Sequence, residues 1–141
     1  MDDLDELGHP RQRFKTVASA IAAAEQVMAL PPADRGVDLR WQAIIQIEFF
    51  VESDPEPVWN FVARWGGSDD EDLRDAVACL LLEELLRHHF ELIFPRIECE
   101  AAKSSQFADM LCRCWAFGQT ELPENKVRFD TLRRACGGLV W

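Results

Sequence analysis

The segment 68–90 constrains the fold more than any other stretch of this chain, because its apolar residues recur at the spacing of an α-helix. They extend around much of the helix circumference: Leu73, Ala76, Val77, Ala78, Cys79, Leu80, Leu81, Leu82, Leu85 and Leu86. A helix that is apolar on several sides must be covered by other elements. We therefore expect this helix at the centre of the protein, with neighbours from both ends of the chain.

The start of this central helix carries polar residues suited to a helix N-terminus. Ser68 and Glu71 have the spacing of a capping box, in which each side chain satisfies a free backbone N–H of the first turn. Asp69, Asp70 and Asp72 add negative charge at the positive end of the helix dipole. The sequence therefore predicts a helix that begins near Ser68.

Proline, glycine and serine divide the rest of the chain into further helices. The apolar spacing predicts them over residues 14–28, 37–52, 55–65, 90–102, 105–117 and 123–136. A break is expected near His88 and His89, and core candidates towards the C-terminus include Trp115, Val127, Leu132 and Cys136. No stretch alternates apolar and polar residues as a strand would, so we expect an all-α protein of about six or seven helices.

Length and composition indicate one domain. A chain of 141 residues with 48% hydrophobic residues can bury a core, but it is short for two ordinary domains. We expect a disordered acidic N-terminus over residues 1–10 and a single helical domain over residues 11–141. Five cysteines, an odd number within helical patterns, favour reduced thiols in the cytoplasm. No apolar run approaches the roughly 20 residues of a membrane span.

A short repeat suggests how the helices are arranged. Asp38-Leu39-Arg40 recurs 34 residues later as Asp72-Leu73-Arg74, and each tripeptide opens a long apolar helix. Residues 72–80, which read DLRDAVACL, resemble the second helix of a HEAT-like repeat, and the resemblance covers about residues 37–118. It implies a small right-handed stack of antiparallel helix pairs, an α-solenoid. Such a stack binds other macromolecules through its surface, usually without catalysis.

The net charge of −10 is concentrated in the middle of the chain, where residues 48–100 hold 14 acidic and 4 basic residues. Such a surface repels nucleic acid and anionic membranes and attracts a basic protein. The candidate binding surface combines acidic side chains with aromatic ones: Glu48, Glu52, Asp72, Asp75, Glu83, Trp41 and Phe49. We expect Asp75 and Glu83 on the solvent side of the central helix.

No motif in the sequence supports a metal site, a cofactor or catalysis. Glu84 and His88 are one residue further apart than the Glu-x-x-His of di-metal bundles, and no second copy exists. Cys112 and Cys114 would point to different sides of a helix. No glycine-rich phosphate loop and no nucleophile motif is present. We therefore expect no metal, no cofactor and no catalytic residue.

Two functions remain open at this point. The first is a non-catalytic interaction module whose acidic surface binds a basic partner; a bacterial immunity protein that masks a toxin would be one form. The second is a small-ligand or enzymatic protein with a pocket lined by aromatic and histidine side chains: Trp59, Trp65, His88, His89 and Trp115.

Overall fold

The computed structural model describes residues 4–31 and 37–137, and the regular structure of these residues is helical, which confirms the all-α prediction. The elements are α1 (Val17–Ala29), α2 (Val37–Glu48), α3 (Pro55–Trp65), α4 (Glu71–Val77), the π-helix η1 (Ala78–Leu82), α5 (Glu83–Lys103), α6 (Ser105–Cys112), the 3-10 helix η2 (Gly118–Glu121) and α7 (Pro123–Ala135). Among the described residues, no helix is long and apolar enough to cross a bilayer.

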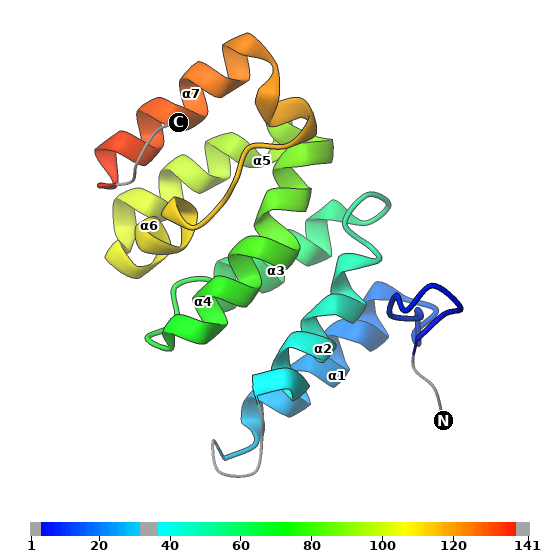
Figure 1. Ribbon diagram of the computed structural model, residues 1–141. Coiled ribbons are helices and arrows are strands. Elements are labelled where there is room, and N and C mark those ends of the chain that lie inside the picture. The colour runs from blue at the N-terminus through cyan, green and yellow to red at the C-terminus, as the bar shows by residue number, and fades with distance from the viewer. Residues whose placement is uncertain (1–3, 32–36, 138–141) are drawn as a thin grey trace.

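The helices are arranged around one long central rod, as Figure 1 shows. The rod consists of α4, η1 and the first half of α5, which follow one another without a loop. The antiparallel pair α1 and α2 lies at one end of the molecule, and α6 and α7 lie at the other (Figure 1). The central position of this rod is what the apolar pattern of residues 68–90 predicts.

The rod supplies much of the buried core. Leu81, Leu82, Leu85 and Leu86 have no exposed surface, and neither does Phe90. The start of the rod differs from the expected capping box, because the helix begins at Glu71 and Asp70 caps it. The Asp70 carboxylate accepts a hydrogen bond from the backbone N–H of Leu73 (3.2 Å).

The expected break near the two histidines is present, because His89 has non-helical angles (φ −139°, ψ 44°) within α5. The side chain of Gln119 holds this kink from the neighbouring 3-10 helix. Its Oε1 accepts the backbone N–H of Phe90 (2.9 Å), and its Nε2 donates to the backbone carbonyl of His88 (2.8 Å). Gly118, at φ +54°, permits this approach, since a Cβ atom there would meet Arg87 at 2.5 Å.

His89 ties the same kink to the turn that follows α2. Its Nε2 lies 3.1 Å from the carbonyl oxygen of Val51 and 2.9 Å from that of Glu52. Because a carbonyl oxygen can only accept, Nε2 must carry the hydrogen. The kink therefore fixes the first half of α5 against the end of α2.

Several boundaries follow the sequence signals, and some burial predictions are wrong. α3 and α7 begin at Pro55 and Pro123, as expected, but α2 ends at Glu48 rather than near residue 52. Trp115 and Val127, expected in the core, are 53% and 66% exposed. Both predictions extended a helical stripe: α6 ends before Trp115, and α7 buries the face that carries Phe129.

The residues before α1 form a short loop that packs beside α2. Asp5 accepts hydrogen bonds from the backbone N–H groups of Leu7 and His9, both at 2.8 Å. Leu4 and Pro10 form an isolated bridge, which closes the loop. Residues 1–3 of the predicted disordered segment and the apolar tail 139–141 lie outside the described residues.

Candidate functional site

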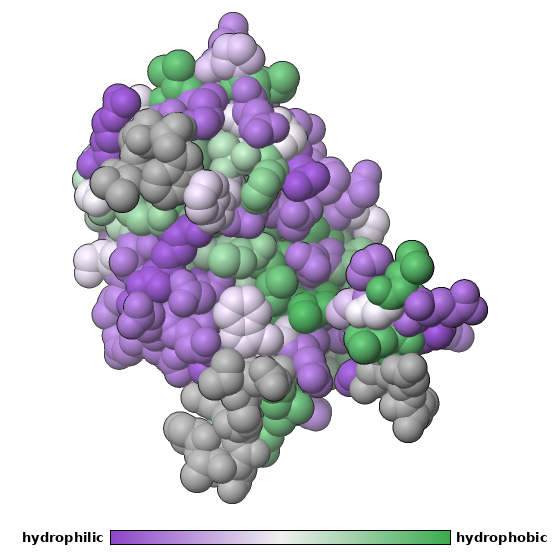
Figure 2. Space-filling view, in the orientation of Figure 1, coloured by the Kyte–Doolittle hydropathy of each residue, from purple (hydrophilic) through white to green (hydrophobic). Residues whose placement is uncertain are grey.

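Three apolar side chains form a stripe on the outer face of α2 and the turn that follows it. Trp41 and Ile45 are half-buried, and Phe49 is 41% exposed. We call these three residues the α2 patch. Figure 2 shows apolar side chains gathered near the centre of the face over α2 and the π-helix, with hydrophilic residues around them. An apolar patch with a polar rim is typical of an interaction site.

Three carboxylates from two helices gather at the edge of this patch: Glu48 on α2, and Glu83 and Glu84 on α5. Burial, and then repulsion from Glu84, raises the pKa of Glu48 to about 7. Burial also raises the pKa of Glu83 to about 7, against the opposing effect of its hydrogen bond from the Trp115 backbone N–H (2.8 Å). The three carboxylates therefore repel one another, and Glu48 and Glu83 are also poorly solvated.

The basic side chains near these carboxylates lie closest to Glu84. Arg87 Nε lies 3.4 Å from its Oε1, and His88 Nε2 lies 3.6 Å from its Oε2. Glu48, by contrast, has no hydrogen bond or ion pair with another described side chain. The edge of the α2 patch therefore carries a surplus of negative charge when Glu48 and Glu83 are ionised.

Glu83 is only 6% exposed, so the expectation that it lies on the solvent side of the central helix is wrong. The surroundings of the rod explain the difference. The rod is covered on several sides, and the segment after α6 packs against Glu83, whose carboxylate accepts the backbone N–H of Trp115 (2.8 Å).

The raised pKa values predict how stability depends on pH. In the unfolded chain both carboxyls titrate near 4.5, and in the folded protein near 7. The folded state therefore binds protons more tightly than the unfolded chain. The resulting contribution to the free energy of unfolding is full below pH 4.5, falls between pH 4.5 and 7 and is absent above pH 7.

We expect Glu83→Gln, which cannot ionise but can still accept the Trp115 N–H, to be more stable than the wild type at pH 8. The gain is about 1 kcal/mol after an allowance for solvent screening, and it should vanish only below the unfolded pKa of 4.5, at about pH 4. Denaturant unfolding at the two pH values measures it. Glu98→Gln, at an exposed position, is the matched control. A gain in stability of the same size at both pH values would contradict the raised pKa of Glu83.

Asp72 and Asp75, also expected on the binding surface, are used within the protein. Arg40, whose side chain is 7% exposed, donates to Asp70 (2.7 Å) and Asp72 (2.9 Å). The indole N–H of Trp41 also donates to Asp72, at 3.2 Å. Asp75 accepts a hydrogen bond from Arg113 (2.6 Å). These carboxylates therefore already hold α2, α4 and α6 together.

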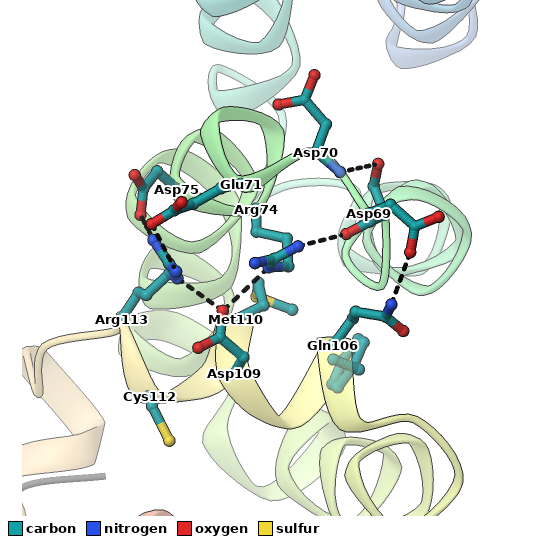
Figure 3. A network of polar contacts seen from close by, with 12 residues as sticks. Asp69, Asp70, Glu71, Arg74, Asp75, Gln106, Asp109, Met110, Cys112 and Arg113 are labelled. Atoms are coloured by element: carbon teal, nitrogen blue, oxygen red, sulfur yellow. Dashed lines mark hydrogen bonds and ion pairs between the residues drawn. The ribbon is translucent and has the colours of Figure 1, made fainter.

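Figure 3 shows how this network continues between α4 and α6. Arg74 and Arg113 both donate to Asp109, at 3.0 and 2.9 Å, and Arg113 also reaches Glu71 at 3.2 Å. Burial works to raise the pKa of Asp109, but the hydrogen bonds from Arg113 and Arg74 outweigh it and lower this pKa. The Asp109 carboxylate is thus stabilised in its charged form by two arginines, which suits a structural role.

The remaining candidate residues do not form one pocket. Glu52 is exposed, and its side chain has no hydrogen bond or ion pair with another described residue. Trp65 lines a cleft between α3 and α6 with Phe107, whereas Trp59 lines a different cleft with Pro95. Neither cleft is lined by Trp115, His88 or His89.

The groups that could bind a metal or react as nucleophiles are dispersed. Within the described part of the chain, no three His, Cys, Asp or Glu side chains are placed to hold a metal ion. All five cysteines are free thiols. Burial raises the pKa of Cys79, Cys112, Cys114 and Cys136, which lowers the fraction of reactive thiolate.

Sequence reasoning missed two features of this site. The sequence pattern presents Glu84 only as a candidate metal ligand, whereas the fold places it beside Glu48. The sequence also predicts no structure for residues 1–10, whereas residues 4–10 belong to a loop whose continuation, at Arg11 and Arg13, is hydrogen-bonded to Gln46 of α2. No local pattern indicates that Glu84 lies beside Glu48, because the two residues are 36 positions apart in the sequence. No pattern in the sequence indicates the loop contact, because a single glutamine side chain makes it.

The fold and the site define an all-helical protein with an apolar patch bordered by carboxylates. A family model described as a family of unknown function (DUF6869) matches residues 30–136, which is more than half of the chain. The chain belongs to this family. No curated protein and no solved structure matches it.

Proposed function

We propose that the protein is a non-catalytic interaction module that binds a basic protein partner at the α2 patch and its acidic edge. The observation that carries the proposal is the position of Glu48. This carboxylate is half-buried beside exposed Phe49, is repelled by Glu84, and has no cation of its own.

A lysine or arginine from a partner would complete this arrangement. It would supply the missing positive charge at Glu48, and Phe49 would lose its exposed surface at the same time. Interfaces draw their affinity from buried aromatic anchors, and charge complementarity speeds association. Glu52, which follows Phe49 by three residues, adds a second unpaired carboxylate to this surface.

We also propose that the helices form a HEAT-like stack, the framework on which this surface is displayed. The two Asp-Leu-Arg tripeptides support this arrangement. Arg40, at the end of the first, reaches from α2 to Asp70 and Asp72 at the start of α4. Arg74, at the end of the second, reaches from α4 to Asp109 on α6. Equivalent arginines thus link every second α-helix, from α2 to α4 and from α4 to α6, as stacked helix pairs would.

An inhibitor of a basic enzyme, such as an immunity protein, is one form that this function could take. The acidic middle of the chain would speed its association with such an enzyme. The free and poorly ionised thiols support a reducing compartment such as the cytoplasm. Nucleic acid is an unfavourable partner for this face, because its carboxylates would repel phosphates.

Charge reversal tests the proposal. We expect Glu48→Lys/Glu52→Lys to slow association with the partner on the order of tenfold at low salt, while the melting temperature stays within a few degrees. The wild-type association rate should also fall as salt rises, because exposed charges are screened beyond about 8 Å at physiological ionic strength. Affinity capture identifies the partner, and association kinetics at pH 8 measure both effects.

Glu98→Lys/Glu124→Lys is the matched control. It changes the net charge equally at two exposed positions, on α5 and α7. A partner held by the wild type and the control, but not by the Glu48/Glu52 reversal, supports the proposal. Equal association rates for all three proteins at every salt concentration would contradict it.

A second candidate function is binding or acid–base chemistry on a small ligand. The observation in its favour is that the pKa values of Glu48 and Glu83 are both near 7, where a carboxyl can exchange protons at neutral pH. A ligand that stabilises the wild type in a thermal-shift screen, but not the Glu48→Gln variant, would favour this function over protein binding.

A further inference from the structure

A small cavity lies between the loop before α1 and the exposed side of α2. It has a volume of about 70 Å³ and is lined by Leu4, Pro10, Arg13, Gln42, Ile45 and Gln46. Ile45 belongs to both this cavity and the α2 patch. The cavity therefore adjoins the surface that we propose for docking.

The wall of this cavity is held by specific hydrogen bonds. The Gln46 side chain, in a residue only 4% exposed, accepts the backbone N–H of Arg13 (2.8 Å) and donates to the backbone carbonyl of Arg11 (2.9 Å). Arg11 Nε in turn donates to the carbonyl of Leu4 at 2.7 Å. The loop is thus fixed to α2 at a distance that leaves the cavity open.

The loop does not fill this space with its own apolar side chains. Leu4 remains 43% exposed, and Leu7 is 80% exposed. Protein interiors are packed with few voids, and a cavity of roughly 150 Å³ can hold a benzene ring. A space of about 70 Å³ is roughly half that size, which suits the end of one aliphatic side chain.

Most of the surface that lines the cavity is apolar, which favours an aliphatic group over a polar one. Leu4, Pro10 and Ile45 supply this apolar surface, Arg13 and Gln42 are the other polar lining residues, and the amide group of Gln46 is already bonded to the loop backbone. Glu48 follows Ile45 by three residues, so the two side chains lie on neighbouring positions of the same helix face. If an aliphatic side chain of the partner occupied this cavity, a lysine or arginine about one helical turn away in the partner would lie close to Glu48.

We propose that this cavity receives one aliphatic side chain, of the size of valine or leucine, from the basic partner. The inference rests on the proposed function. It adds that the partner segment carries an aliphatic residue about one turn from a lysine or arginine. Interface anchors commonly occupy such small pockets, with charged groups at the rim.

The direct test uses isobutane, which reproduces the end of a leucine side chain, as the probe. We expect isobutane to shift the methyl NMR signals of Leu4 in a saturable manner in the wild-type protein. Ile45→Phe places a larger side chain in the cavity wall and should abolish the shift without lowering the melting temperature. Val127→Phe, a comparable change at an exposed position on α7, should leave the shift intact.

The second measurement uses the captured partner. Ile45→Phe should weaken its affinity about tenfold, mainly through faster dissociation, whereas Val127→Phe should have no effect. Isobutane without any effect on the Leu4 signals, or full partner affinity in Ile45→Phe, would overturn the inference. If Ile45→Phe binds with full affinity but the Glu48/Glu52 reversal associates slowly, the proposed function is supported and the aliphatic anchor in the cavity is contradicted. If the reversal has no effect either, both proposals are contradicted.

Discussion

We expect Leu81→Ala to lower the free energy of unfolding by about 2–5 kcal/mol, the range for removing a large buried side chain. Leu81 has no exposed surface and lies in the π-helix at the middle of the central rod. α2, α3, α4 and α6 all contact this π-helix, so a cavity there cannot close by a shift of one neighbour. Urea unfolding monitored by circular dichroism measures the change.

Leu92→Ala is the matched control, because Leu92 lies on α5 but is 39% exposed. Its cost should be below about 1 kcal/mol, since only part of its surface is removed from water on folding. If Leu81→Ala cost less than about 0.5 kcal/mol, the rod would not be the centre of the core.

We expect Gln119→Ala to cost about 1–3 kcal/mol, the penalty for leaving partly buried polar groups without partners. In a continuous helix the N–H of Phe90 would bond to the carbonyl of Leu86, but the kink at His89 turns it towards Gln119. The amide side chain satisfies this N–H and the carbonyl of His88 together. Alanine satisfies neither group.

Two further variants make this prediction specific. Gln119→Glu keeps an acceptor for Phe90 N–H but loses the donor to His88, so its cost should lie between those of the wild type and alanine. Gln106→Ala removes an exposed contact to Asp69 and should cost less than about 0.5 kcal/mol. We expect the Phe90 amide to exchange hydrogen faster in Gln119→Ala than in the wild type or in Gln106→Ala. Unchanged exchange would show that the Gln119 side chain does not protect this amide.

The sequence by itself determined the helical class and most of the helix ends. Pro55 and Pro123 start their helices because proline fixes φ and needs no hydrogen-bond partner in the first turn. Ser104 caps α6 by accepting the Phe107 N–H (3.1 Å). The apolar run of residues 73–86 likewise determined that one helix is surrounded by the others. These features depend on residues close together in the chain, so local patterns reveal them.

Only the tertiary structure decided which charges remain available for a partner. Asp72 and Asp75 look like free surface acids in the sequence, but Arg40 and Arg113, more than 30 residues away, neutralise them. Glu83 is buried because the segment after α6, remote in the sequence, packs against the rod and donates the Trp115 N–H to its carboxylate. The pKa of Glu48 is raised because the fold first buries this carboxyl and then places Glu84, but no cation, beside it. The physical reason is that charge pairing and desolvation depend on distances between remote residues, and only packing sets those distances.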